Sequence, residues 1–237
     1  MSFLTAEWRK LILVNYAIDP GLLAPFIPTG TSLDFYDEKC FVSLVGFMFI
    51  DTRLRGRRIP YHINFEEVNL RFYVKPEYDQ TRRGVVFIKE IVPRIALSLV
   101  ANFLYKERYQ TLPMRHHWSK LEDSQMIGYA WAAKKKWQSV NVRAANTSLP
   151  IEVGSEAEFI TEHYWGYTQV NDRRTYEYEV THPTWEHYPV NDLEINVDFA
   201  LTYGKYFAFL QTLEPHSVLL AEGSKITVEG KRELIFA

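Results

Sequence analysis

Stretches rich in apolar and β-branched residues recur along the chain and predict a fold built mainly of strands. Residues 41–50 are apolar at odd and even positions alike, which is typical of a strand buried on both faces. Residues 65–74 alternate instead, with apolar side chains at even positions and mostly polar ones at odd positions. Further strands are predicted at residues 8–16, 84–92, 125–142 (two strands or one bent strand) and 174–182, with a hairpin at 216–232.

A few helices interrupt these strands. Asp19 followed by Pro20 is typical of a helix start. Ser155 and Glu158 form a capping box for a helix that ends near Gly166. Helical spacing also spans residues 94–105, whose apolar stripe is Ala96, Leu99, Val100 and Phe103 and whose polar stripe is Arg94, Ser98 and Asn102. Residues 193–203 fit helix and strand equally well.

Many strands, few helices and no repeat or linker predict one α+β domain over residues 1–237, mostly β and antiparallel or barrel-like. Lys and Arg total 27 against 29 Asp and Glu, a balance that disfavours nucleic-acid and membrane-surface binding. The single cysteine, Cys40, excludes an internal disulfide and favours a reducing compartment. The longest mostly apolar run, 41–50, is too short to cross a bilayer, and no export signal is visible. A cytoplasmic protein is therefore expected.

Motifs of the common cofactor-dependent enzymes are absent from the sequence. It has no phosphate-binding loop, no glycine-rich dinucleotide turn, no G-x-S-x-G elbow and no H-E-x-x-H. His116 and His117 are adjacent, so they point to opposite faces of an extended chain. His182 and His187 also differ in parity. No cofactor and no metal site are expected.

The polar face of residues 65–74 carries the best candidate for a ligand site. Glu67, Asn69 and Arg71 stand two residues apart, so all three project together. If this face points into a barrel, the arginine and the glutamate could fix a carboxylate or carbonyl ligand. If it faces solvent, the charges form cross-strand pairs instead. Both alternatives stay open at the level of sequence.

Two further side chains are candidates on strands. Glu90 shares its parity with the apolar Ile88, so it is either paired, with Arg94 as the partner, or a catalytic acid with a raised pKa. His182 continues one row of the strand at 174–182. It could act as a general acid or base, or bond to the backbone at the strand end.

Several short segments spread over nearly the whole chain form a joint pattern, including FEEVNLR at 65–71 and HPTW at 182–185. The other segments are residues 3–9, 19–31, 42–47, 51–53, 83–88, 91–94 and 112–114. This pattern resembles the YqjF-like proteins, an uncharacterised bacterial family grouped by fold with acetoacetate decarboxylase. The resemblance implies a closed, cone-like antiparallel β-barrel with a few flanking helices, and a homo-oligomer. It does not carry a function with it.

Acetoacetate decarboxylase acts through a lysine that forms a Schiff base, followed by a second lysine, just after a helix. If the helix at 94–105 corresponds, the resemblance places Tyr109 near the reactive lysine, where it could donate a hydrogen bond to a ligand or simply pack. The paired lysines are missing at Tyr109, and Lys106 is three residues away from it. The lysine cluster at 134–136 is expected on a solvated edge strand.

The sequence therefore predicts a protein that takes a small oxo acid or other carboxylate inside the barrel without a Schiff-base lysine. Two alternatives remain open. One is a non-catalytic ligand sensor or protein-interaction module whose barrel is filled by side chains. The other is a lyase that uses an unrecognised lysine.

Overall fold

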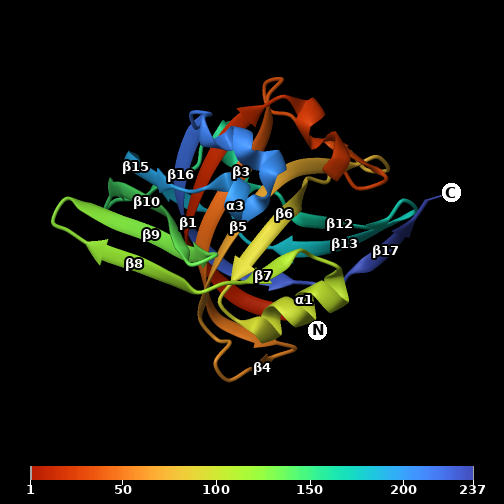
Figure 1. Ribbon diagram of the computed structural model, residues 1–237, viewed down its shortest axis with the longest axis horizontal. Coiled ribbons are helices and arrows are strands. Elements are labelled where there is room, and N and C mark those ends of the chain that lie inside the picture. Colours follow the sequence, from red (N-terminus) through yellow and green to blue (C-terminus); the bar gives the residue numbers. More distant parts are fainter. Residues whose placement is uncertain (1, 237) are drawn as a thin grey trace.

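Four long strands form the centre of the computed structural model, which describes residues 2–236 apart from the side chains at 97, 100, 101, 104 and 105. They pair antiparallel in chain order (Figure 1). These strands are β1 (Leu4–Ile18), β3 (Cys40–Leu54), β5 (Phe65–Pro76) and β6 (Gly84–Val92). Each coincides with a predicted strand. β1 and β3 extend several residues beyond their predicted ranges of 8–16 and 41–50.

Strand pairing continues beyond both edges of this group. β6 pairs in parallel with β12 (Trp165–Asn171), which pairs antiparallel with β13 (Arg174–Thr181). On the other side, β1 pairs with β16 (Ser217–Val228). β13 and β16 then pair through two residues each, so the pairings return to their starting strand. The same sheet includes the short strands β2 (Thr31–Leu33), β4 (Arg57–Arg58), β7 (Tyr109–Thr111), β11 (Leu149–Pro150), β14 (Glu186–Tyr188) and β17 (Arg232–Ile235).

A second, four-stranded sheet packs beside the first. Its strands are β8 (Met114–Lys120), β9 (Ser124–Ala133), β10 (Lys136–Ala145) and β15 (Val190–Asn196), in the order β15-β10-β9-β8. The prediction of two strands at 125–142 is confirmed. The predicted edge strand for the lysine cluster is wrong, because Lys134 and Lys135 have φ angles of 46° and 68° and form the turn between β9 and β10. A two-residue hairpin turn requires this left-handed backbone.

The two faces of the main sheet build two separate cores. Val68, Leu70 and Phe72 of β5 are fully buried in a cluster that includes Trp131 and Val140 of the second sheet. The opposite face contributes to a cluster that contains Phe47, Tyr178 and Trp185. Since the second sheet covers the even positions of β5, the odd positions of β5 lie on the opposite face of the main sheet, on the side of the second cluster.

The helices are few and short, so the fold is α+β and mostly β, as predicted. They are η1 (Pro20–Phe26), α1 (Ile95–Tyr105), α2 (Glu156–Thr161), α3 (Phe199–Tyr203) and η2 (Lys205–Gln211). Asp19 caps η1 and Ser155 caps α2, each accepting a backbone N–H of the first turn. α2 ends before Gly166, because β12 already begins at Trp165. None of the described helices is long and apolar enough to span a bilayer.

α1 turns its polar stripe, not its apolar one, toward the rest of the protein. Leu99 and Phe103 are 64% and 77% exposed. Ser98 is buried and its hydroxyl lies 2.8 Å from that of Thr111. Asn102 both donates to the carbonyl and accepts from the N–H of Tyr109. These hydrogen bonds hold residues 109–111 against α1. The side chain of Val100, also part of the predicted apolar stripe, lies outside the described part of the chain.

The predicted hairpin at 216–232 is wrong. β16 runs through most of this range as one strand paired with β1, and the β17 strand that follows pairs with β13 instead. Gly223 has a φ of 80° inside β16, and a Cβ atom there would lie 2.1 Å from the carbonyl oxygen of Trp8. The glycine therefore permits a local irregularity of the strand rather than a turn.

Candidate functional site

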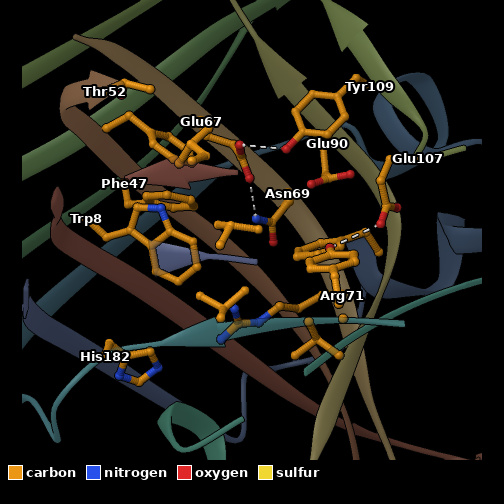
Figure 2. Close-up of a pocket in the computed structure, with 18 of the residues that line it drawn as sticks. Trp8, Phe47, Thr52, Glu67, Asn69, Arg71, Glu90, Glu107, Tyr109 and His182 are labelled. Atoms are coloured by element: carbon orange, nitrogen blue, oxygen red, sulfur yellow. Dashed lines mark hydrogen bonds between the residues drawn. The ribbon is translucent and has the colours of Figure 1, made fainter. Parts of the chain in front are cut away.

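A cavity of about 370 Å³ lies on the inner side of the main sheet. Its wall combines aromatic side chains with a compact set of acids, as Figure 2 shows. Trp8 packs edge-to-face on Phe47, with ring centroids 5.3 Å apart, and on Trp185 at 6.3 Å. A cavity with apolar walls and a few convergent polar groups is the usual form of a small-molecule site.

The odd positions of β5 form a polar row along this cavity. Glu67, Asn69 and Arg71 all line it and are only 2%, 1% and 8% exposed. Asn69 Nδ2 donates to Glu67 Oε1 at 2.9 Å. The alternative of a solvent-exposed face is therefore wrong. The alternation in the sequence separated the two faces correctly, and the second sheet decides which of them is interior.

Glu90 also points into the cavity, through a local irregularity of β6. Asn69 pairs with Glu90, but Arg71 pairs with Phe87, so one extra residue of β6 is inserted between these pairs. This β-bulge reverses the side-chain parity. Glu90 therefore shares the cavity with Phe87, not with Ile88, which lies in the core on the other face. The prediction that Glu90 lies on the same face of the strand as Ile88 is wrong for this reason.

The predicted pairing of Glu90 with Arg94 is likewise wrong. Arg94 precedes α1 as its N-cap residue and is exposed, and it does not line the cavity. Instead, burial first and then the charges of Glu107 and Glu67 raise the pKa of Glu90 well above its ordinary value. Glu90 is thus one of a group of buried acids rather than half of an ion pair.

Glu107 is a cavity residue that sequence reasoning missed. It follows α1 and is 7% exposed, and its carboxylate accepts hydrogen bonds from the hydroxyls of Thr168 and Tyr178, the latter at 3.1 Å. Burial raises the pKa of Glu107 to about 7, and burial likewise raises the pKa of Glu67 to about 7. A carboxyl group in this range exchanges protons near neutral pH.

Tyr109 lies on β7, which pairs with β6 along the edge of β6 that faces away from β5. It pairs in parallel with Glu90, and its hydroxyl donates to Glu67 Oε2 at 3.3 Å. Burial and the charges of Glu67 and Glu90 raise the pKa of Tyr109 well above its ordinary value. The phenol is therefore a hydrogen-bond donor to the acid group, at the wall of the cavity.

Arg71 lies away from this acid group, toward His182 (Figure 2). Within the described part of the chain, its guanidinium donates to the carbonyl of Ile160 at 3.4 Å, and its Nε has no hydrogen-bond partner. The guanidinium also lies 5.7 Å from the ring centroid of Tyr73. A buried guanidinium with an unused donor is available to an anionic ligand.

His182 directly follows the last residue of β13, and its ring lines the cavity. The ring stacks on Trp185 at 4.2 Å, and its Nδ1 lies 3.0 Å from the carbonyl oxygen of Pro183. Burial lowers the pKa of His182. The predicted hydrogen bond between His182 and the backbone is therefore present, and the ring also faces the cavity.

A charged cluster around the buried carboxylate of Asp34 adjoins the cavity through His163. Asp34 contacts Lys75 at 2.9 Å, Arg83 at 2.8 Å and His163 at 3.4 Å. Burial alone would raise the pKa of Asp34, but these three hydrogen-bond partners outweigh it and hold the pKa well below its usual range. Burial lowers the pKa of His163, which lines the cavity, to about 4. The imidazole is therefore neutral at pH 7.

None of the cavity-lining side chains that the structure describes is a lysine. Lys106 is exposed at the end of α1. Lys89 is half-buried and burial lowers its pKa, but its ammonium donates to the carbonyl of Thr202, next to the other core. In the described part of the chain, no three His, Cys, Asp or Glu side chains are placed to hold a metal ion.

Comparison with known proteins places the chain. The model of the family DUF2071, an uncharacterized conserved protein, matches residues 5–225. The chain belongs to this family. It is also 25% identical over 184 residues to the uncharacterized protein YqjF of Bacillus subtilis, covering 75% of this chain and 72% of that protein. The resemblance to the YqjF-like proteins is therefore confirmed.

Solved structures with the same fold include acetoacetate decarboxylases. The enzyme from Legionella pneumophila superposes with a TM-score of 0.65 at 12% identity, covering 99% of this chain and 87% of that one. An acetoacetate decarboxylase-like enzyme from Sphingomonas wittichii gives 0.68 at 13%, covering 100% and 95%. The enduracididine biosynthesis enzyme MppR, complexed with pyruvate, gives 0.68 at 13%, covering 98% and 91%. At these identities, the likeness shows the fold alone.

Proposed function

We propose that this protein binds a small oxo acid or other carboxylate in the cavity, and that the guanidinium of Arg71 donates hydrogen bonds to the ligand's carboxylate oxygens. The observation that carries the proposal is the buried guanidinium, whose Nε lacks a partner within the described structure. Leaving a buried charged donor unpaired costs on the order of 1–3 kcal/mol or more. A ligand carboxylate would accept from Nε with one oxygen and from a terminal guanidinium N–H with the other. In an oxo acid, the carbonyl oxygen next to the carboxylate can take one of these two places.

The ring of pairings from β16 through β1, β3, β5, β6, β12 and β13 supports the finer proposal of a closed, cone-like barrel around this cavity. The decarboxylase-like fold of the structural relatives supports it too. The cavity itself argues against a barrel filled by side chains. A Schiff-base mechanism receives no support, because no described lysine lines the cavity.

The test is thermal unfolding with pyruvate, 2-oxobutanoate, acetoacetate, butanoate and acetone. Ligands that bind only the folded state stabilise it by about 2.7 kcal/mol at one hundred times their Kd. For a chain of this size, that corresponds to a rise of about 5–10 °C in Tm. We expect the oxo acids to produce such a rise in the wild-type protein and acetone to produce none.

Two matched variants locate the effect. Arg71→Met should abolish the rise, each protein being compared with its own ligand-free Tm. Arg143→Met removes an exposed arginine from β10 of the second sheet and should keep the rise. A wild-type protein that responds to no carboxylate, or an Arg71→Met variant that responds fully, would overturn the proposal.

A further inference from the structure

The cavity has more acids than one arginine can balance. Glu67 on β5, Glu90 on β6 and Glu107 before β7 are each at most 7% exposed. Figure 2 shows them grouped with Tyr109, while the side chain of Arg71 points away from them, in the direction of His182. Buried carboxylates that outnumber nearby cations must take up protons or acquire a positively charged partner.

Two acceptor atoms in this group make no hydrogen bond of good geometry in the described structure. They are Oε2 of Glu90 and Oδ1 of Asn69, on side chains that are 2% and 1% exposed. The Tyr109 hydroxyl lies near the Glu90 carboxyl group, but it donates to Glu67. The two residues face each other in register across β5 and β6, so their side chains adjoin on the cavity wall. Buried acceptors are almost always hydrogen-bonded. A proton on Glu90 supplies one donor in the free protein, and a ligand that brings its own donors satisfies both acceptors and leaves Glu90 ionised.

The expected donor is an organic cation rather than a metal ion. The described acids do not converge closely enough to hold a metal. The surrounding wall is aromatic, with Tyr109 on the acid side and Phe65 and Phe87 also lining the cavity. Aromatic faces together with carboxylates are the surroundings that protein sites offer to ammonium groups.

We propose that the ligand of this cavity carries a protonated amino group as well as its carboxylate, the amino group lying against Glu90 and Asn69. The inference rests on the proposed function, because the carboxylate end is the anion assigned to Arg71. Asn69 and Arg71 are two residues apart on β5, so their side chains leave the same face from Cα atoms about 7 Å apart. An ω-amino acid of about five carbons separates its two charged groups by a similar length and is therefore the first ligand to test.

Binding of such a cation favours the ionised acids and should release protons. The titratable and charged groups that face this part of the cavity share its wall: Glu67 and Arg71 of β5, Glu90 of β6, Glu107 and Tyr109 around the start of β7, Tyr178 and His182 at β13, and His163 after α2. Arg108 is exposed outside this wall, and its charge lowers the pKa of Glu107 without outweighing burial. Since burial holds the pKa of Glu67 and Glu107 at about 7, affinity for the amino acid should increase from pH 6 to pH 8.

The experiment is isothermal titration calorimetry with three matched probes, namely pentanoate, 5-aminopentanoate and pentylamine. We expect 5-aminopentanoate to bind at least tenfold more tightly than pentanoate at pH 8, with a smaller ratio at pH 6. Glu90→Gln should reduce the ratio below threefold while pentanoate still binds, which shows that the cavity remains folded. Glu122→Gln alters an exposed glutamate on the turn before β9 and should leave the ratio unchanged.

The outcomes separate the two proposals. Pentanoate and 5-aminopentanoate binding equally, or a ratio that survives Glu90→Gln, would overturn the amino-group inference and leave the carboxylate site standing. Binding of pentylamine without binding of either carboxylate would support the acid subsite but overturn the inference that one ligand carries both groups. Failure of all three probes in the wild-type protein would overturn the amino-group inference, and the thermal test with the oxo acids would decide the proposed function separately.

Discussion

Replacing Glu67 by glutamine should make the protein more resistant to unfolding at neutral pH, against the usual cost of altering a buried residue. Burial raises the pKa of this carboxyl group from 4.5 to about 7. Below pH 4.5, the group is protonated in the folded and the unfolded chain alike. Between pH 4.5 and 7, the unfolded chain releases the proton and the folded chain keeps it, so the free energy of unfolding decreases as pH rises.

The size of this effect follows from the shift. A difference of 2.5 pKa units corresponds to about 3 kcal/mol, lost between pH 4.5 and 7 and constant above. Glutamine has nearly the same shape and can still accept from Asn69 Nδ2, but it has no proton to lose. The free energy of unfolding of Glu67→Gln, minus that of the wild type, should therefore increase by about 3 kcal/mol from pH 4.5 to 8.

Urea unfolding followed by tryptophan fluorescence at half-unit pH steps measures both curves. The neutral, buried His163 works in the opposite direction, because the unfolded chain takes up a proton below pH 6.5 that the folded chain does not accept until about pH 4. That contribution is common to both proteins and cancels in the difference. Glu122→Gln, at an exposed site, should give a flat difference. A flat difference for Glu67→Gln itself would refute the claim that Glu67 is held protonated by burial.

Three further substitutions test the packing by the midpoint of urea unfolding. Phe72→Ala removes a fully buried ring and should lower the free energy of unfolding by about 3–5 kcal/mol; an unchanged midpoint would contradict its place in the core between the sheets. Gly166→Ala should cost about 1–3 kcal/mol, because a Cβ would lie 2.2 Å from Cζ of Tyr178, and no loss would show that the ring moves freely. Leu99→Ser should change stability by no more than about 0.5 kcal/mol, since Leu99 is 64% exposed; a larger loss would place α1 the other way round.

Alternation along β5 was sufficient to predict which side chains stand together. It could not show which face is interior, since a period of two separates the faces without assigning them. That assignment depends on Trp131 and the other side chains of the second sheet, which are distant in sequence and cover the even positions. Glu67, Asn69 and Arg71 are therefore predictable as a group but not as a cavity wall.

The remaining differences arise where one local feature overrides a regular pattern. A single inserted residue in β6 changed the side on which Glu90 lies, and nothing in the sequence of that strand marks the bulge. In α1, the apolar stripe predicted the buried face, but the hydrogen bonds of Ser98 and Asn102 to the following segment hold the helix the other way. Glu107 was missed because it lies in a connection, where periodicity makes no prediction.

The fold shared with acetoacetate decarboxylases positions the cavity, and the side chains that line the cavity determine its chemistry. After α1, this chain presents Glu107 and Tyr109, both hydrogen-bonded to the cavity wall by described partners. A carboxyl group and a phenol can donate, accept and exchange protons, but neither can form a Schiff base with a ketone. The chemistry that Glu107 and Tyr109 themselves offer is therefore proton transfer and charge recognition. That is why the comparison of pentanoate with 5-aminopentanoate, and its change with pH, is the most informative first experiment.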